Sequence, residues 1–313
     1  MKENQPRWRA PHQPVLYQQV IDILQPHTSC RYVDGTVGAG GHAAGILEAS
    51  KPHGQLLALD LDEMALKIAQ DHLNIYNPRV FFRHGSYAVL TAHISSIGWD
   101  CVNGIILDLG VSSMQLDTAE RGFSFSKAAP LDMRFDINQN KSAADLVNHL
   151  SEGELEKIIR LYGEDPSARR IAAAITTHRP IFTTTELATV IEKSTKHHRG
   201  PIHPATRTFQ ALRIAVNREL DELDKGLKEA IKCLCSGGRL VVISFHSLED
   251  RQVKQYFQQE NRGCLCPPKQ PICTCKHQAS VKMLTKKIIK PTLEETESNP
   301  RARSAKMRAV EKI

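Results

Sequence analysis

A glycine-rich turn between an apolar run and a small-residue segment constrains this chain more than any other feature. In the stretch YVDGTVGAGGH at residues 32–42, the apolar run ends in Asp34, and four glycines lead into an alanine-rich segment. Residues without a Cβ at a strand-to-helix turn let a ligand approach the main chain and the helix N-terminus. The stretch therefore predicts the first strand, turn and helix of a ligand-binding βαβ unit.

Two further apolar runs also end in a carboxylate. About twenty residues after Gly40, the run LLAL ends in Asp60, which is the spacing at which a second strand offers an acid to ribose hydroxyls. The run GIIL at residues 104–107 ends in Asp108. Because parallel strands share one carboxyl edge, we expect three acids at a single site. Such a site predicts an adenosine-containing cofactor.

The choice of cofactor depends on charge. The stretch at residues 38–43 matches a loose dinucleotide fingerprint, so an NAD(P)-dependent oxidoreductase is one interpretation. Asp34 would repel a pyrophosphate, whereas it can reach the ammonium of S-adenosylmethionine, and three acids suit a sulfonium ligand. We therefore expect S-adenosylmethionine as the cofactor, with Asp34, Gly38, Gly40, Asp60 and Asp108 around it.

Alternating strand and helix patterns indicate a parallel sheet. We expect helices at residues 14–24 and 62–73, and a strand at 79–82. A glycine turn followed by an apolar run at residues 236–245 continues the sheet, and the tail at 301–313 suits an antiparallel edge strand. The predicted fold is α/β, a class I (Rossmann-like) sheet built from residues 1–111 and 216–313.

Between these two parts the pattern is helical. Residues 143–200 have helical periodicity, Thr183 and Glu186 form a capping-box start, and one long helix is expected at 204–234. The sequence thus predicts an inserted all-helical domain at residues 112–215.

Composition indicates an ordinary globular protein with a basic surface. The chain has 313 residues, 41% of them hydrophobic, and 41 Lys and Arg against 34 Asp and Glu give a net charge of +7. A polyanionic partner is therefore plausible. The N-terminus lacks the apolar core of a secretory signal, and no apolar run is long enough to span a bilayer, which predicts a cytoplasmic protein without a membrane partner.

Basic residues crowd one loop of the insertion and the helix after it. Few acids separate them, as expected for a surface that neutralises RNA phosphates; a solvated basic face is the alternative. The candidate RNA-binding residues are Lys196, Arg199, His203, Arg207 and Arg213.

Three polar stretches follow strands or lack periodicity. Residues 108–117 and 244–251 leave strands at the predicted cofactor edge, and residues 121–134 form part of a long segment without periodicity. Such loops are usually functional or disordered, and the aromatic content here argues against disorder.

These motifs together resemble one family. They are similar to those of the bacterial ribosomal RNA small subunit methyltransferase H family, also called MraW, and they cover almost the whole chain. The motifs are DGTxGxGGH at 34–42, DLGVSS at 108–113, RGFSF at 121–125, PLDMR at 130–134, HPATRTFQ at 203–210, SFHSLEDR at 244–251 and NPRARS at 299–304.

The resemblance implies a specific reaction. It implies methyl transfer from S-adenosylmethionine to N4 of a cytidine in the decoding region of 16S rRNA, within the 30S subunit, and a homodimer is compatible with it. Tyr87 would stack on adenine. The cofactor contacts it implies are Gly40, Gly41, His42, Asp60, Tyr87, Asp108 and Gln115.

The chemistry of the acceptor suggests catalytic candidates. The lone pair of N4 is delocalised into the ring, so an enzyme must flip the base, align N4 with the methyl group and accept a hydrogen bond from it, without a covalent intermediate. The first candidates for the acceptor are Asp108 and the backbone of Ser112 and Ser113, followed by Asp132 and His246. A non-catalytic RNA-binding protein with a vestigial pocket is the competing hypothesis.

The cysteines are expected to be mostly thiols or ligands rather than disulfides, as in a cytosolic protein. Four of them lie in two CxC pairs flanked by prolines, which could hold zinc or remain reduced surface thiols. Paired zinc ligands usually have two intervening residues rather than one. The four are Cys264, Cys266, Cys273 and Cys275.

Overall fold

The computed structural model describes residues 14–195, 203–267, 270 and 272–313. The chain divides into two units, one of Met1–Gly110 with Glu222–Ile313 and one of Val111–Asp221. The predicted insertion at 112–215 therefore ends six residues earlier than the second unit. Among the described helices, none combines the length and apolar character needed to cross a membrane.

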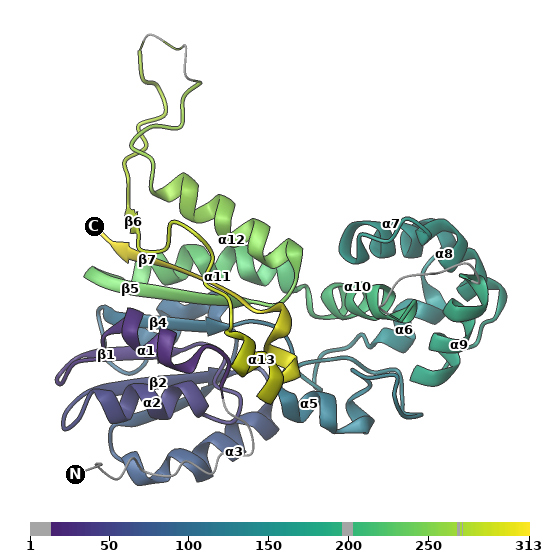
Figure 1. The fold of residues 1–313 in the computed structure, drawn as a ribbon, viewed down its shortest axis with the longest axis horizontal. Helices are drawn as coiled ribbons and strands as arrows, with labels where there is room; N and C mark the ends of the chain where they lie inside the picture. Colours follow the sequence, from purple (N-terminus) through teal and green to yellow (C-terminus); the bar gives the residue numbers. More distant parts are fainter. Residues whose placement is uncertain (1–13, 196–202, 268–269, 271) are drawn as a thin grey trace. The chain divides into compact units, whose positions relative to one another are not determined.

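The first unit contains a mixed sheet. Within the described residues, seven strands pair in the order β3-β2-β1-β4-β5-β7-β6, and β7 is antiparallel to both of its neighbours (Figure 1). This is the class I methyltransferase-like sheet that the sequence predicted. The strands are β1 (Arg31–Asp34), β2 (Gln55–Asp60), β3 (Val80–His84), β4 (Val102–Asp108), β5 (Leu234–Ser244), β6 (Val281–Met283) and β7 (Lys306–Lys312).

Helices cover both faces of the sheet. Successive residues of a strand point to opposite faces, so Ile106 of β4 enters one core while Ile105 and Leu107 enter the other. Helices α1, α2 and α3 supply the first core, and α4, α11 and α12 the second. Their bounds, with those of the other helices of this unit, are α1 (Tyr17–Leu24), α2 (Gly41–Ala49), α3 (Glu63–Leu73), η1 (Asn74–Tyr76), η2 (Tyr87–Val89), α4 (Leu90–Ser95), α11 (Glu219–Cys233), α12 (Ser247–Glu260), α13 (Leu293–Ser298) and η4 (Pro300–Ser304).

The strand order reverses between β1 and β4, which are neighbours in the sheet. Chain connections leave these two strands in opposite directions, and ligands of open α/β sheets bind in the crevice that results at their carboxyl ends. Asp34 and Asp108 are the last residues of these two strands. The fold thus places two of the predicted acids at the expected site.

Two details of the sheet differ from the sequence prediction. The tail strand β7 is antiparallel as expected, but it is not the edge, because β6 pairs with its outer side. The predicted glycine turn lies inside β5, where Gly237 has φ +77 and the register with β4 shifts. The strand can absorb these residues because such irregularities leave the extra residues unpaired.

The second unit is helical and has its own core. The capping box predicted at Thr183 is present at the start of α9, where Thr183 Oγ1 accepts a hydrogen bond from Glu186 N and the Glu186 side chain accepts one from Thr183 N. Ser142 and Ser151 begin α6 and α7 in the same way. The helices are α5 (Ser113–Asp117), η3 (Ala119–Arg121), α6 (Ala143–His149), α7 (Glu152–Gly163), α8 (Ala168–Thr177), α9 (Thr184–Ser194) and α10 (Ala205–Asn217).

The prediction of a single helix at residues 204–234 was wrong. The structure has two helices, α10 and α11, separated at Arg218, which has φ +51. The Asn217 amide donates to the carbonyl of Met133 and accepts from Phe135 N. These long-range hydrogen bonds fix the end of α10, and a periodic apolar pattern contains no sign of them.

The cysteines are mostly thiols, as expected, with one exception. Cys101 and Cys235 form a disulfide between the residue before β4 and the paired strand β5. The other cysteines, all in described positions, are free.

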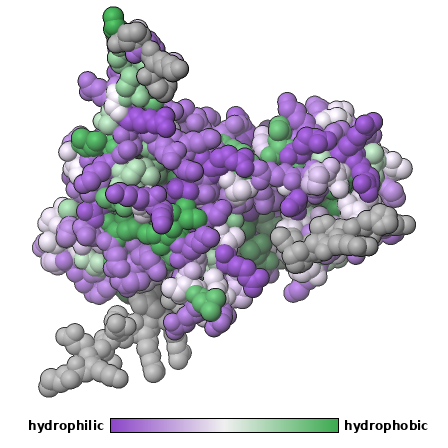
Figure 2. Space-filling view, turned by 45° about the horizontal axis from the view of Figure 1, so that its top comes forward, coloured by the Kyte–Doolittle hydropathy of each residue, from purple (hydrophilic) through white to green (hydrophobic). Residues whose placement is uncertain are grey.

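The surface drawn in Figure 2 is mainly hydrophilic, with smaller hydrophobic areas. This agrees with the apolar residues of strands and helices lying in the cores.

Candidate active site at the carboxyl edge of the sheet

The turn between β1 and α2 leaves its backbone accessible at one glycine. Gly38 has φ +52, and a Cβ built on it would approach only Thr36 O, at 3.9 Å. Gly40, with φ +83, and Gly41 differ, because added Cβ atoms would press on Leu73 and Pro14. Gly38 therefore provides room for a ligand, whereas the other two glycines also allow close packing within the protein.

The three predicted carboxylates meet at this turn. Asp34 is buried, and this burial raises its pKa to about 7 although His42 opposes the rise and Asp108 and Asp60 add to it. Burial also raises the pKa of Asp60 to about 6, against hydrogen bonds from Asp62 N and Gly38 N, each 2.9 Å long. Because these carboxyl groups are costly to ionise in this environment, a positively charged ligand beside them would be favoured.

His42 and Asp108 form the least satisfied pair of this edge. His42 Nε2 lies 3.7 Å from Asp108 Oδ2. Among the described residues, neither ring nitrogen of His42 nor Asp108 Oδ1 has a hydrogen-bond partner. An unsatisfied buried polar atom costs about 1–3 kcal/mol, so several together indicate the place of a ligand.

Thr36 is a residue of this site that the sequence reasoning missed. Its hydroxyl accepts a hydrogen bond of 2.7 Å from the backbone N–H of Asp108, and its own N–H donates to Asp34 Oδ1. It thereby ties the ends of β1 and β4 together. Its position in the Asp-Gly-Thr sequence was the available signal.

Tyr87 is held beside the turn from two sides. A Cβ on Gly35 would lie 3.2 Å from Tyr87 Cβ, and a Cβ on Gly226 of α11 would collide with the Tyr87 ring. Ser86, the N-cap of η2, donates to Glu222 Oε2 at 2.7 Å. The sequence reasoning identified Tyr87 but missed Glu222 and Gly226, since their role depends on packing between distant segments.

Gln115, Ser112 and Ser113 belong to the second unit, at α5. Ser112 Oγ accepts from Gln115 N at 3.2 Å, and Gln115 Oε1 accepts from Ser112 N at 3.0 Å, which makes a capping box. Ser113 is the first residue of the helix. The carbonyl oxygen of the Gln115 amide thus has a structural role within this unit.

The other two catalytic candidates differ in how well their polar atoms are satisfied. Asp132 receives two hydrogen bonds from the Arg134 guanidinium, at 2.7 and 2.8 Å; burial would raise the pKa of Asp132, but these bonds hold it below its usual value. His246 caps α12, and its Nε2 lies 3.1 Å from Glu249 Oε1. The Arg134 contacts reduce the case for Asp132 as a catalyst, whereas His246 Nε2 is buried without a hydrogen-bond partner among the described residues.

The predicted RNA-binding residues fall into three groups. Lys196 and Arg199 lie outside the described residues. His203 and Arg207 are exposed at the start of α10, where the His203 ring lies 4.7 Å from that of Phe125. Arg213 instead forms a bidentate ion pair with Glu219, both distances being 2.8 Å, and both side chains are largely buried. That ion pair argues against a role for Arg213 in binding phosphate.

Comparison with known proteins gives one consistent result. The model of the MraW methylase family matches residues 9–313. A protein named ribosomal RNA small subunit methyltransferase H from Dehalococcoides mccartyi is 52% identical, covering 97% of this chain and 87% of the relative. Proteins of the same name from Syntrophotalea carbinolica and Thermomicrobium roseum are 50% and 48% identical, each covering 96% of this chain and 98% and 94% of their own lengths.

The raised pKa of Asp34 predicts how stability depends on pH. An acid whose pKa rises from 3.8 to about 7 on folding makes the folded state lose stability as pH increases through that range. Asp34→Asn keeps the acceptor for Thr36 N and removes this cost. We expect the variant, without cofactor, to gain on the order of 3 kcal/mol over the wild type between pH 4 and pH 8, measured by urea unfolding.

Asp71→Asn, at an exposed carboxylate of α3, is the matched control. If the stability of Asp34→Asn and of the wild type changed with pH in the same way, the raised pKa of Asp34 in the folded protein would be contradicted.

Proposed function

Because the chain belongs to the MraW methylase family, we propose that it transfers a methyl group from S-adenosylmethionine to N4 of a cytidine in 16S rRNA. The coarser activity, methylation of small-subunit rRNA with S-adenosylmethionine, follows from the family and its named members. The cytidine and its N4 atom come from the resemblance of the motifs. The observation that carries the assignment of the site is the unsatisfied pair of His42 and Asp108 beside the open turn at Gly38.

The residues of the edge fit S-adenosylmethionine. When bound, it supplies an electrophilic methyl group on a sulfonium. Asp34 would receive its ammonium, and Asp60 its ribose hydroxyls, while Tyr87 would lie against its adenine. Two acids whose pKa values are raised by desolvation are better matched to a cation than to the pyrophosphate of NAD(P), which disfavours the oxidoreductase interpretation.

Asp108 is the residue we assign to the acceptor nitrogen. Its Oδ1 is buried without a described partner, and its backbone is fixed by Thr36. A carboxylate in that state can accept a hydrogen bond from the amino group and draw electron density back onto N4. Asp132, which is bonded to Arg134, and His246, which caps α12, are the weaker candidates.

The proposed reaction is a direct displacement. When bound, S-adenosylmethionine would supply the methyl group: N4 would bond to the methyl carbon as that carbon's bond to sulfur breaks, with S-adenosylhomocysteine as the leaving group. N4 then loses one proton, which Asp108 can pass to solvent. No covalent bond to the enzyme is required, because the amino group itself is the nucleophile.

Four basic residues at and before the start of α10 are the proposed RNA contacts. His203 and Arg207 lie at the start of α10, and Lys196 and Arg199 precede it in the sequence, outside the described residues. We propose the assembled 30S subunit as the substrate. Methylation of 30S particles and of free 16S rRNA, compared in one assay, tests this choice.

Removing the acceptor should abolish most of the activity. At saturating S-adenosylmethionine, we expect Asp108→Asn to slow single-turnover methylation roughly a hundred-fold or more, because the amide is a far weaker hydrogen-bond acceptor and base. The exposed Asp100→Asn is the control. Mass spectrometry of 16S rRNA from a strain lacking the protein, complemented with each variant, identifies the methylated atom. A normal rate for Asp108→Asn would remove it from the reaction.

A methyl group on Gly226 should displace the Tyr87 ring. Because alanine favours helices over glycine, Gly226→Ala should not destabilise α11 through its propensity. We expect roughly ten-fold weaker binding of S-adenosylmethionine by calorimetry, corresponding to about 1.4 kcal/mol. Gly153→Ala in α7, where a Cβ meets nothing within 4 Å, is the matched control.

Unchanged affinity in Gly226→Ala would exclude Tyr87 from the cofactor site. If the wild type did not bind S-adenosylmethionine, the hypothesis of a non-catalytic RNA-binding protein with a vestigial pocket would be favoured.

Charge removal should separate RNA binding from cofactor binding. We expect Lys196→Ala, Arg199→Ala and Arg207→Ala each to weaken RNA binding and to reduce the slope of log affinity against log salt by about one. Affinity for S-adenosylmethionine should not change. Lys228→Ala, at an exposed lysine of α11, controls for net charge. Equal loss of cofactor affinity would instead make these residues structural.

A further inference from the structure

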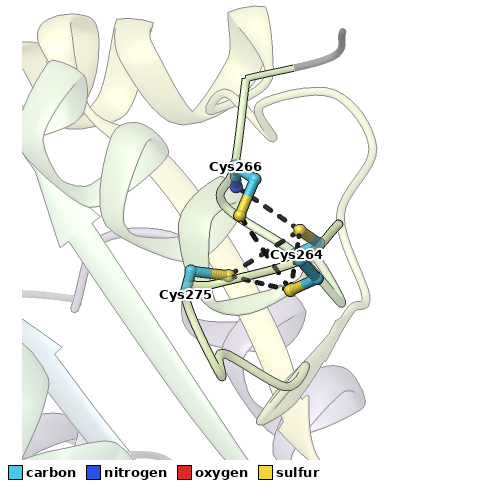
Figure 3. Close-up of side chains that lie close together, drawn as sticks. Cys264, Cys266 and Cys275 are labelled. Atoms are coloured by element: carbon cyan, nitrogen blue, oxygen red, sulfur yellow. Dashed lines mark hydrogen bonds between the residues drawn. The ribbon is translucent and has the colours of Figure 1, made fainter. Parts of the chain in front are cut away.

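The segment between α12 and β6 brings four thiols together. Cys264 Sγ lies 3.5 Å from Cys273 Sγ and 3.7 Å from Cys275 Sγ, and the last two sulfurs are 3.6 Å apart. Cys266 Sγ is 3.9 Å from Cys273 Sγ. Figure 3 shows the cysteine side chains pointing toward one another from two stretches of the loop.

Backbone amides hold these sulfurs in a reciprocal pattern. Leu265 N, in the middle of the first CxC pair, donates to Cys275 Sγ at 3.3 Å, and Thr274 N, in the middle of the second, donates to Cys266 Sγ at 3.4 Å. The middle residue of each CxC pair thus donates a backbone hydrogen bond to the second cysteine of the other pair. Such N–H···S bonds stabilise thiolates and orient them as ligands.

Hydrophobic burial does not explain the order of this segment. Residues 261–280 contain no described helix or strand, and Leu265 and Ile272 are 40% and 76% exposed. The segment extends beyond the ends of α12 and β6 in Figure 1, and Figure 2 shows hydrophobic colour at its tip. A segment this small without a core usually needs a disulfide or a metal.

Its base, by contrast, is well anchored. Ser280 N donates to Glu260 O at 2.9 Å, and Ser280 Oγ donates to Glu260 Oε2 at 2.6 Å. Ile313 N donates to Ser280 O, which connects the base to the end of the chain. The four cysteines lie beyond this base, where the described structure offers little else to fix the loop.

We propose that Cys264, Cys266, Cys273 and Cys275 bind one Zn²⁺ as a structural site. Tetrahedral zinc with bonds of about 2.3 Å to sulfur separates its ligand sulfurs by about 3.8 Å, close to the distances here. Binding converts four thiols to thiolates and releases their protons, so the site carries two negative charges after the metal is counted. No oxidant is needed.

Zinc fits this geometry better than the alternatives. Disulfide sulfurs are about 2.05 Å apart, and these four are not paired in that way. Four thiolates in a tetrahedron bind zinc or iron, and among the described residues no oxygen or nitrogen ligand joins them, which disfavours harder cations. The site is closed, with no position left for water, and is therefore structural rather than catalytic.

Metal analysis of the full-length protein, purified without chelator, tests the proposal. We expect one zinc per chain in the wild type and a loss of at least about ten-fold in the double variant Cys264→Ser/Cys275→Ser, because two thiolates rarely retain a structural zinc. Cys30→Ser, which replaces a free cysteine of the first unit, should keep its zinc.

Cobalt provides a readout that does not depend on the variant. Wild-type protein stripped of metal and loaded with Co²⁺ should show the sulfur-to-cobalt charge-transfer and visible bands of tetrahedral thiolate coordination. Tryptic cleavage at Arg262 and Lys276 should accelerate on metal removal, because the loop loses its cross-link. Iron in place of zinc, two disulfides by mass spectrometry, or zinc content unaffected in the double variant would each overturn the proposal.

Discussion

The buried meeting of acidic strand ends is the constraint on which the site depends. Parallel pairing of β1 with β2 and β4 brings Asp34, Asp60 and Asp108 to one edge, where desolvation opposes the ionisation of Asp34 and Asp60. The N–H groups of Gly38 and Asp62 offset part of this cost for Asp60, and Thr36 N offsets part for Asp34. The remaining deficit is electrostatic, and a cationic ligand is the simplest means of relieving it.

This explains which parts of the site could be predicted from the sequence. Each acid ends an apolar run, so its position at the edge follows from local pattern and from the rule that parallel strands share a carboxyl edge. Gly226 and Glu222 carry no such signal. Their contacts with Tyr87 and Ser86 join segments more than 130 residues apart, and only the packed fold brings them together.

The difference between local pattern and long-range contact also explains the main error in the predicted fold. Apolar residues recur with helical period through residues 204–234, and the break at Arg218 falls within that pattern. What ends α10 is the Asn217 side chain, which bonds to backbone atoms of Met133 and Phe135. The ion pair of Arg213 with Glu219 then bridges the break, which turns a residue expected on the RNA surface into a structural one.

Sequence spacing alone is insufficient to assign the state of the cysteines. Sequence spacing could not pair Cys101 with Cys235, because their proximity arises from the register of β4 with β5, 134 residues apart in the chain. The two CxC pairs are local, yet spacing left both zinc and free thiols open and favoured the thiols. The reciprocal amide bonds at Leu265 and Thr274 favour zinc, because they orient sulfurs toward a common centre that four mutually repelling thiolates would otherwise avoid.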